Sequence, residues 1–305
     1  MFAKLLPASL LAAAACVPVD QIPESVSAQR DLHSSGIVHF SDVCEKWDDW
    51  DKPTEPFQIS ANTYYVGTCG IAAILITGDE AHTLIDSGTK AGADVVLSNI
   101  AALGFDPRHV SIVLNSHEHF DHVGGMAAVQ EATGAIVVST EIGIEVMESG
   151  IAHPADPQFG MHGPMAPIAH GVSYLTPDIQ ELLTSLGLTA IETPGHSPGA
   201  MSWQWESCDA GGCQTIVYAD SLSPVSRDDY RFSDHPDYVV EYRAGIERLA
   251  VLDCDILLTP HPSHSRMIER AATGSFMGGV TCAEYAEGKR RDLDARLTRE
   301  AGGDQ

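Results

Sequence analysis

Basic side chains are scarce in this chain. Its 305 residues include 17 Lys and Arg against 42 Asp and Glu, for a formal net charge of -25. Proteins that bind nucleic acid neutralise the phosphates with Lys and Arg, so this balance argues against a nucleic-acid partner. Hydrophobic residues make up 44% of the chain, which suits a globular core and argues against a disordered protein.

A long apolar run at the N-terminus is also missing. The apolar stretch from Leu5 to Ala15 has eleven residues, too few to cross a bilayer, and its position after Lys4 is typical of a secretory signal. Cleavage before Cys16 would give a lipoprotein, whereas cleavage after Ala28 would release a free chain. We therefore expect residues 1–28 to be a signal segment and the protein to be periplasmic, either free or anchored to the membrane through a lipid on Cys16.

Seven cysteines are present, and loss or lipidation of Cys16 leaves six. An exported chain meets an oxidising environment, where six thiols can form three disulfides with 15 possible connectivities. Cys208 and Cys213 flank a Gly-rich segment typical of a tight hairpin, so we pair these two. The remaining expected disulfides are Cys44–Cys69 and Cys254–Cys282.

The pattern of the chain changes near residue 56. Residues 29–55 are rich in acidic residues and predict an N-terminal arm that carries Trp47 and Trp50, whereas 56–305 predicts one catalytic domain. Within that domain, short β-rich runs give way to alternating strands and helices, and this order occurs twice. The expected strands are Phe57–Ser60, Thr63–Val66, Ile71–Thr77, His82–Ile85, His109–Leu114, Ala135–Val138, Val172–Leu175, Leu188–Glu192, Ala200–Trp205, Thr215–Tyr218 and Asp255–Thr259.

The expected helices include Ala91–Leu103, Gly124–Ala132, Glu141–Glu148, Tyr238–Leu252 and Cys282–Arg299. The last alternates acidic and basic residues, which predicts a solvated helix face. Two similar halves stacked sheet on sheet with helices outside make a four-layer αββα sandwich of the α/β class. Residues 150–171 have no usable period, and we interpret them as a flap that brings Phe159, Met161 and Met165 to a substrate.

A cluster of metal-ligand side chains follows the strand that ends at Leu114. The segment His117-Glu118-His119-Phe120-Asp121-His122 places three imidazoles and a carboxylate within six residues. In an extended segment His117 and His119 project from the same side and can reach one metal, while Asp121 and His122 face a second. Imidazole nitrogen and carboxylate oxygen are ligands of zinc.

Two further histidines follow strands in the same way. Pro and Gly on both sides of His196 predict a tight turn that presents its side chain, and His261 lies between Pro260 and Pro262 after the next strand. Loops at strand ends are where a sheet sandwich carries its chemistry. We therefore add His196 and His261 to the candidate ligands.

The ordered set Asp86, His117-x-His119-x-Asp121-His122, His196, Asp220 and His261 resembles the five-motif pattern of the metallo-β-lactamase superfamily over roughly residues 57–262. The segments that resemble its third subclass are Tyr64–Thr68, Pro194–Trp203, Tyr218–Ser223 and Thr259–Pro262. The pair Cys254 and Cys282 also fits a disulfide common in that subclass.

This resemblance implies two zinc ions, one on His117, His119 and His196 and the other on Asp121, His122 and His261. It also implies that Ser221 and Ser223 bind the substrate carboxylate, and that Asp86 orients a ligand histidine. Ser221 stands where the first subclass has a cysteine ligand. His264 departs from the family pattern and stays unassigned.

The expected reaction is opening of the β-lactam ring of penicillins, cephalosporins and carbapenems, which confers antibiotic resistance. A zinc-bound hydroxide oriented by Asp121 would attack the carbonyl, because zinc lowers the pKa of bound water to about 7. The expected partner is this small-molecule substrate alone, with the protein a monomer.

Two alternatives remain open at this point. The first is another hydrolase of the same fold, a lactonase or a hydroxyacylglutathione-type thioesterase, in which Asp220 bridges both metals. The second is a zinc-binding protein without catalytic activity, which is disfavoured because such a protein would be expected to have lost metal ligands.

Overall fold

The computed structural model describes residues 36–169 and 171–302. The expected signal segment, with Cys16 and the bond after Ala28, lies outside the described residues. Within the described ranges, no helix is both long and apolar enough to cross a membrane.

The first sheet contains seven strands in chain order. The first four strands are antiparallel, and the last three continue parallel to β4. Parallel neighbours need crossovers, which α2 (Gly92–Ala102), α4 (Met126–Thr133) and α5 (Glu141–Ser149) provide. The strands are β1 (Phe57–Ser60), β2 (Thr63–Tyr65), β3 (Ile74–Thr77), β4 (His82–Ile85), β5 (Val110–Leu114), β6 (Ile136–Ser139) and β7 (Val172–Tyr174).

The second sheet has the strand order β11-β10-β9-β8. Its strands β8 to β10 form an antiparallel meander, and β11 pairs parallel to β10. The strands are β8 (Leu188–Glu192), β9 (Met201–Asp209), β10 (Gly212–Tyr218) and β11 (Ile256–Leu258), and the helices of this half are α6 (Pro177–Ser185), α7 (Pro236–Ala250), α8 (Met267–Ala271) and α9 (Cys282–Gly302).

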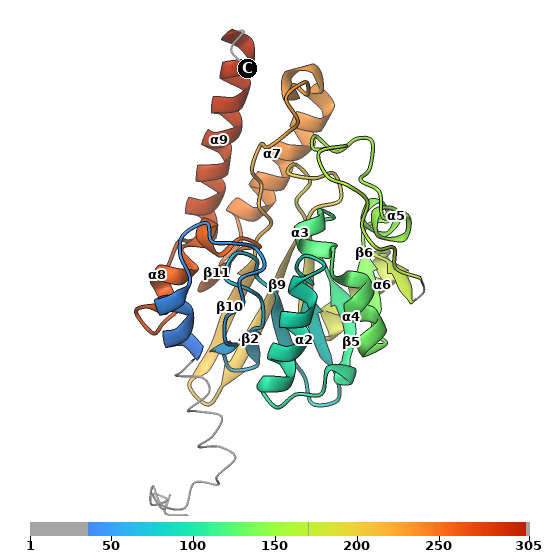
Figure 1. Ribbon diagram of the computed structural model, residues 1–305. Coiled ribbons are helices and arrows are strands. Elements are labelled where there is room, and N and C mark those ends of the chain that lie inside the picture. Colours follow the sequence, from blue (N-terminus) through green and yellow to red (C-terminus); the bar gives the residue numbers. More distant parts are fainter. Residues whose placement is uncertain (1–35, 170, 303–305) are drawn as a thin grey trace, which may run out of the picture.

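The two sheets pack face to face with helices on their outer faces (Figure 1). Side chains alternate along each strand, so Ile85 and Leu114 point inward to Trp203, whereas Leu84 and Val113 point outward into the core beneath α2 and α4. Outward-facing side chains of the second sheet likewise form a core beneath α7 and α9. The predicted four-layer αββα sandwich is therefore confirmed.

The structure differs from the sequence prediction in three elements. Helix α6 was not predicted, and the histidine segment contains a helical turn, α3 (Phe120–Val123), where an extended chain was expected. Helix α9 has a solvated outer face, as predicted, but also a buried face that the sequence did not show. Lys289 lies four residues after Tyr285 and three after Ala286, so these three side chains share the buried face.

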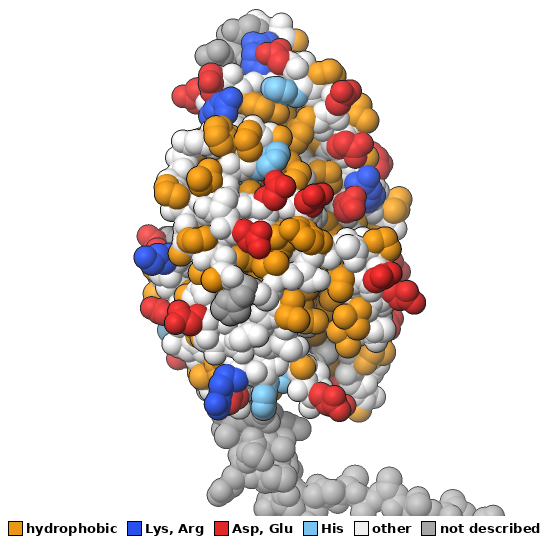
Figure 2. Space-filling model, turned by 90° about the vertical axis from the view of Figure 1, so that its right-hand side faces the viewer, with side chains coloured by type: hydrophobic (Ala, Val, Ile, Leu, Met, Phe, Trp, Pro, Cys, Tyr) orange, Lys and Arg blue, Asp and Glu red, His pale blue; other side chains and the backbone are white. Residues whose placement is uncertain are grey.

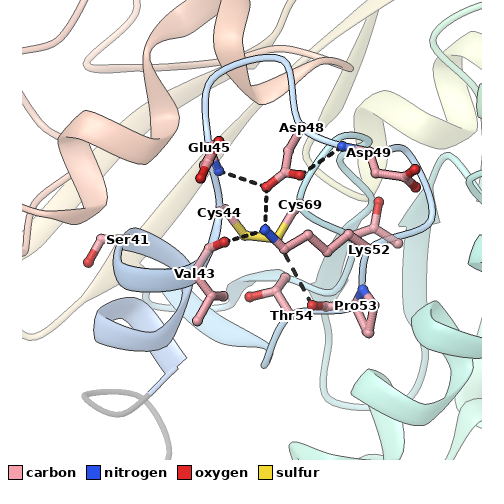
Figure 3. The surroundings of a disulfide bond; sticks show 12 residues. Ser41, Val43, Cys44, Glu45, Asp48, Asp49, Lys52, Pro53, Thr54 and Cys69 are labelled. Carbon is pink, nitrogen blue, oxygen red and sulfur yellow. Dashed lines mark hydrogen bonds and ion pairs between the residues drawn. A yellow bond between two sulfur atoms is a disulfide. The ribbon is translucent and has the colours of Figure 1, made fainter.

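The six cysteines in the described ranges form the three expected disulfides, Cys44–Cys69, Cys208–Cys213 and Cys254–Cys282. The first joins the N-terminal arm to the loop before β3 (Figure 3). Beside it, Lys52 donates to the Val43 carbonyl and to Asp48, whose carboxylate also accepts the Glu45 backbone N–H. The arm is thus covalently tied to the domain.

Candidate metal centre

The six predicted ligand side chains meet at the ends of strands from both sheets. His117 to His122 follow β5, His196 follows β8 and His261 follows β11. The rings of His117, His119 and His196 have centroid separations of 4.7 to 4.8 Å, and the His122 and His261 rings are 5.0 Å apart. One compact cluster therefore spans both halves of the molecule.

The first part of the cluster holds three imidazoles. One nitrogen from each of His117, His119 and His196 lies within 4.8 Å of the others. In each ring, one nitrogen has a protein partner. His196 Nδ1 donates to the Ser223 carbonyl at 2.8 Å, His119 Nε2 lies 2.9 Å from Asp156 Oδ2, and His117 Nδ1 lies 2.8 Å from Asp220 Oδ1. The buried His117 Nε2 has no hydrogen-bond partner among the described residues, as a metal-binding nitrogen should.

The second part surrounds the carboxylate of Asp121. Its Oδ2 lies 3.1 Å from His122 Nε2 and 3.4 Å from His261 Nε2. Both ring nitrogens of His122 are buried and face carboxylates, Nε2 that of Asp121 and Nδ1 that of Asp86, but neither contact has the geometry of a well-directed hydrogen bond. This donor set of two imidazoles and one carboxylate suits a divalent metal.

Burial and the neighbouring charges set the protonation of the cluster. Burial, reinforced by the surrounding imidazoles, holds the pKa of both His117 and His196 well below the usual histidine value, so these rings are neutral. Burial opposes charge on His122 too, but the Asp121 and Asp86 carboxylates outweigh it and raise the pKa of His122 to about 10. Binding of a metal would displace that proton.

A buried carboxylate lies against the outer nitrogen of three of these histidines. Asp156 lies against His119, and Asp220 Oδ1 is 2.8 Å from His117 Nδ1. Asp86 Oδ2 is 3.4 Å from His122 Nδ1 and accepts hydrogen bonds from Ser116 and Tyr218. Such contacts fix the ring orientation of metal ligands. Asp86 was predicted for this position, whereas Asp156 was not.

Glu118 lies inside the histidine segment but points away from the cluster. Its buried carboxylate accepts the Ser197 hydroxyl at 2.7 Å and the Gly199 N–H at 2.9 Å, so it ties the His117 loop to the His196 loop. Burial raises the pKa of Glu118. The pattern His117-x-His119 in the sequence gives no sign of this contact, so the role of Glu118 was not predicted.

The turn that presents His196 requires glycine at position 195. Gly195 has a φ of 155°, and a Cβ there would lie 2.2 Å from Cδ2 of Tyr242 in α7. Its N–H donates to the Ser197 carbonyl at 3.0 Å and closes the turn. The predicted tight turn at Pro194–Gly199 is therefore present.

Aromatic side chains from the arm line the edge of the cluster. Trp50 packs between Phe120 and His261 with ring centroids 5.5 and 5.9 Å apart, and Trp47 meets His264 edge-on at 4.9 Å. The backbone N–H of Trp47 donates to the Ser263 hydroxyl at 2.8 Å. The arm thus forms part of the wall around the metal-ligand cluster.

The irregular segment 150–171 lies beside His119 through Asp156 and through the contact of His162 with Phe120, whose rings are 4.2 Å apart. Phe159 and Met161 are exposed, whereas Met165 packs against the outer core of the first sheet. Met165 also lines a cavity with His119 and Phe120, so its expected contact with a substrate stays a prediction.

Replacement of Asp156 by asparagine is expected to lower both metal affinity and activity by about 10- to 100-fold, the usual effect of removing a carboxylate that orients a metal-binding histidine. The measurements are metal titration and steady-state kinetics. Asp79→Asn removes one charge from an exposed turn and is the matched control. Equal metal affinity in the Asp156→Asn variant and the control would contradict this role for Asp156.

Comparison with known proteins gives the class. The family model of the metallo-β-lactamase superfamily matches residues 66–261, and the chain belongs to this superfamily. Among solved structures, the MIM-2 metallo-β-lactamase is 49% identical, with a TM-score of 0.78 over 87% of this chain and 98% of its own. MEM-A1, a subclass B3 metallo-β-lactamase isolated from a soil metagenome library, is 35% identical, with a TM-score of 0.77 over 84% of this chain and 100% of its own.

Sequence relatives point to the wider superfamily. The hydroxyacylglutathione hydrolase of Anaeromyxobacter dehalogenans is 29% identical over 180 residues, which is 54% of this chain and 59% of that protein. The chain spans less than two thirds of the length of the first curated relatives that it matches. The fold and the histidine cluster therefore define a metal-dependent hydrolase of this superfamily.

Proposed function

We propose that the protein is a metallo-β-lactamase that uses two zinc ions to open the ring of penicillins, cephalosporins and carbapenems. The observation that carries this proposal is the cluster of five imidazoles around a single carboxylate, Asp121. The likeness to MIM-2 and MEM-A1 supports the same substrate class. Export to the periplasm, a lipid on Cys16 and a monomeric state stay predictions.

The donor atoms fit two cations. His117, His119 and His196 would hold one ion, and Asp121, His122 and His261 would hold the other. Each proposed ligand is at least mostly buried, with side-chain exposures of no more than 14%. When bound, the metal supplies an activated water near neutral pH and polarises the substrate carbonyl.

The residues of the chain have separate roles around this centre. Asp121 Oδ2 lies near the ring nitrogens of both His122 and His261, so the other carboxylate oxygen, Oδ1, can hold and orient the proton of a nucleophilic water. Ser223 is half-buried, and the buried Ser221 hydroxyl has no hydrogen-bond partner among the described residues, so both can meet a substrate carboxylate. Trp50 and Phe120 would contact its apolar part.

The negative charge of the protein does not exclude an anionic substrate. On the face shown in Figure 2, acidic side chains are spread among apolar ones and few basic side chains are visible. Beyond a Debye length of about 8 to 10 Å, salt largely screens such surface charges. The charge of the metal-loaded centre would therefore dominate at short range.

Asp220 distinguishes this proposal from the thioesterase and lactonase alternatives. A bridging ligand needs a carboxylate oxygen directed toward both metals. Here Asp220 Oδ1 lies on the outer nitrogen of His117 and Oδ2 accepts the Leu222 N–H at 3.0 Å, so both oxygens already meet protein groups. This position favours an orienting role for Asp220.

Hydrolysis of a substrate panel tests the proposal. We expect turnover of penicillin, cephalosporin and carbapenem with kcat/KM in the range of about 10⁴ to 10⁸ M⁻¹s⁻¹, loss of that turnover with a chelator, and recovery with zinc. The same assay includes lactones and an S-acylglutathione. Turnover of these compounds without β-lactam opening would reject the proposal in favour of the alternative hydrolases.

A further inference from the structure

Helix α9 carries a buried lysine at the edge of the metal-ligand cluster. Lys289 is 6% exposed, and its Nζ donates to the Ser223 hydroxyl at 2.9 Å. Within the described ranges no carboxylate lies within 4.0 Å of this amine, although the chain contains 42 acidic residues. A buried ammonium group thus lacks a direct counter-ion.

Removing an ammonium group from water costs free energy, so a buried charge normally needs compensation from a paired opposite charge. The Tyr285 ring, 5.0 Å from Nζ, supplies part of it. Burial lowers the pKa of Lys289 to about 8, and the more distant Asp292 and Asp220 carboxylates offset only part of that effect. The amine therefore stays largely protonated at neutral pH and would gain from an anion brought by a ligand.

The loop that Lys289 supports also contacts the metal ligands. The Ser223 carbonyl accepts from His196 Nδ1, and the Ser221 carbonyl accepts from the Tyr285 hydroxyl at 3.0 Å. Tyr285 and Lys289 lie four residues apart on the buried face of α9, whose first residue, Cys282, is bonded to Cys254. Helix α9 thus holds both serines next to the cluster.

Polar atoms without partners gather at the same place. The Ser221 Oγ and the Nδ1 of His264 are buried and have no hydrogen-bond partner within the described residues. Lys289 and His264 are close enough for the ammonium charge to contribute, after burial, to lowering the pKa of His264. The Lys289 cation and the unpartnered Ser221 hydroxyl therefore both belong to the surroundings of the loop that contacts His196, and His264 lies within electrostatic range of Lys289 and His196.

We propose that the Lys289 ammonium group, with the hydroxyls of Ser221 and Ser223, binds the carboxylate of the substrate and makes the enzyme selective for β-lactams that carry an acidic group. This inference rests on the proposed β-lactamase function. It assigns a binding role to a residue of the C-terminal helix, and it explains how a chain with so few basic residues recognises an anion.

The test compares benzylpenicillin with its methyl ester, which lacks the negative charge. For the wild-type enzyme, we expect KM for the ester to be about 10- to 100-fold higher than KM for the acid. This factor in affinity corresponds to the loss of a hydrogen bond to a charged group. Lys289→Met should raise KM for the acid by a similar factor, leave KM for the ester within about threefold, and change kcat less than KM. Lys289→Arg should restore most of the acid preference, because it keeps the charge.

Arg291→Met is the matched control, since it removes one charge from an exposed position of the same helix, where Arg291 lies 3.5 Å from Glu287. Its KM for the acid should stay at the wild-type value. Equal KM for acid and ester in the wild-type enzyme would overturn the role of Lys289 even if Lys289→Met did not fold. An equal rise in KM for both compounds in Lys289→Met would do the same, whereas failure of the wild-type enzyme to open either ring would overturn the proposed function itself.

Discussion

Replacement of Asp121 by asparagine is expected to lower kcat for β-lactam hydrolysis by about a thousandfold, because the charge stabilisation that metal ions supply is worth several kcal/mol. Among the residues that the structure describes, Asp121 is the only carboxylate whose oxygen lies near two of the ligand imidazoles, 3.1 Å from His122 Nε2 and 3.4 Å from His261 Nε2. Asparagine keeps the shape of the side chain but removes its charge and one acceptor.

Steady-state kinetics and metal analysis of the purified variant measure this effect. We expect the metal content to fall toward one ion per chain, since the three-histidine group does not include Asp121. Asp79→Asn is again the control, because it removes the same charge from an exposed turn. A variant with full metal content and a kcat within threefold of wild type would show that Asp121 is no ligand.

Removal of the metal is expected to lower the melting temperature by roughly 10 °C, since a ligand at a thousand times its Kd stabilises the folded state by about 4 kcal/mol. The reason lies in the burial of the donors. Without a cation, the buried His117 Nε2 has no hydrogen-bond partner among the described residues, and the buried His122 has only the Asp121 and Asp86 carboxylates beside it. Unpaired buried polar groups destabilise a fold.

Calorimetry of the chelated protein, with and without added zinc, measures this difference. Magnesium serves as the control and should restore little, since it prefers oxygen ligands and the cluster offers five imidazoles. A melting temperature that zinc leaves unchanged would mean that the cluster holds no metal in the folded protein.

Much of the fold could be predicted from the sequence, because both sheets bury two faces and their strands are short apolar runs between turn residues. The predicted strands Phe57–Ser60, His82–Ile85 and Leu188–Glu192 have the observed bounds. Helix α6 was missed although Ile179, Leu182 and Leu183 stand at helical spacing, because the helix has only nine residues and Leu183 is its only fully buried one.

The candidate metal ligands could be found because four of them are neighbours in the chain and the other two stand in turns marked by Pro and Gly. Asp156 could not be found from the sequence, since it is 37 residues from its partner His119 and lies in a segment without regular structure. Lys289 was hidden by the charged residues around it in α9. Only the packing of that helix shows which of its charges face inward.

The disulfide between Cys44 and Cys69 has a consequence for how this enzyme should be produced. Its covalent link holds Trp47 and Trp50 at the mouth of the catalytic centre, although neither tryptophan belongs to a strand or helix of the sandwich. Recombinant protein made in a reducing cytoplasm would lack this link and could fold with the arm released. Two preparations of identical sequence would then bind metal equally and still differ in how tightly they bind the bulky β-lactams that we propose as substrates.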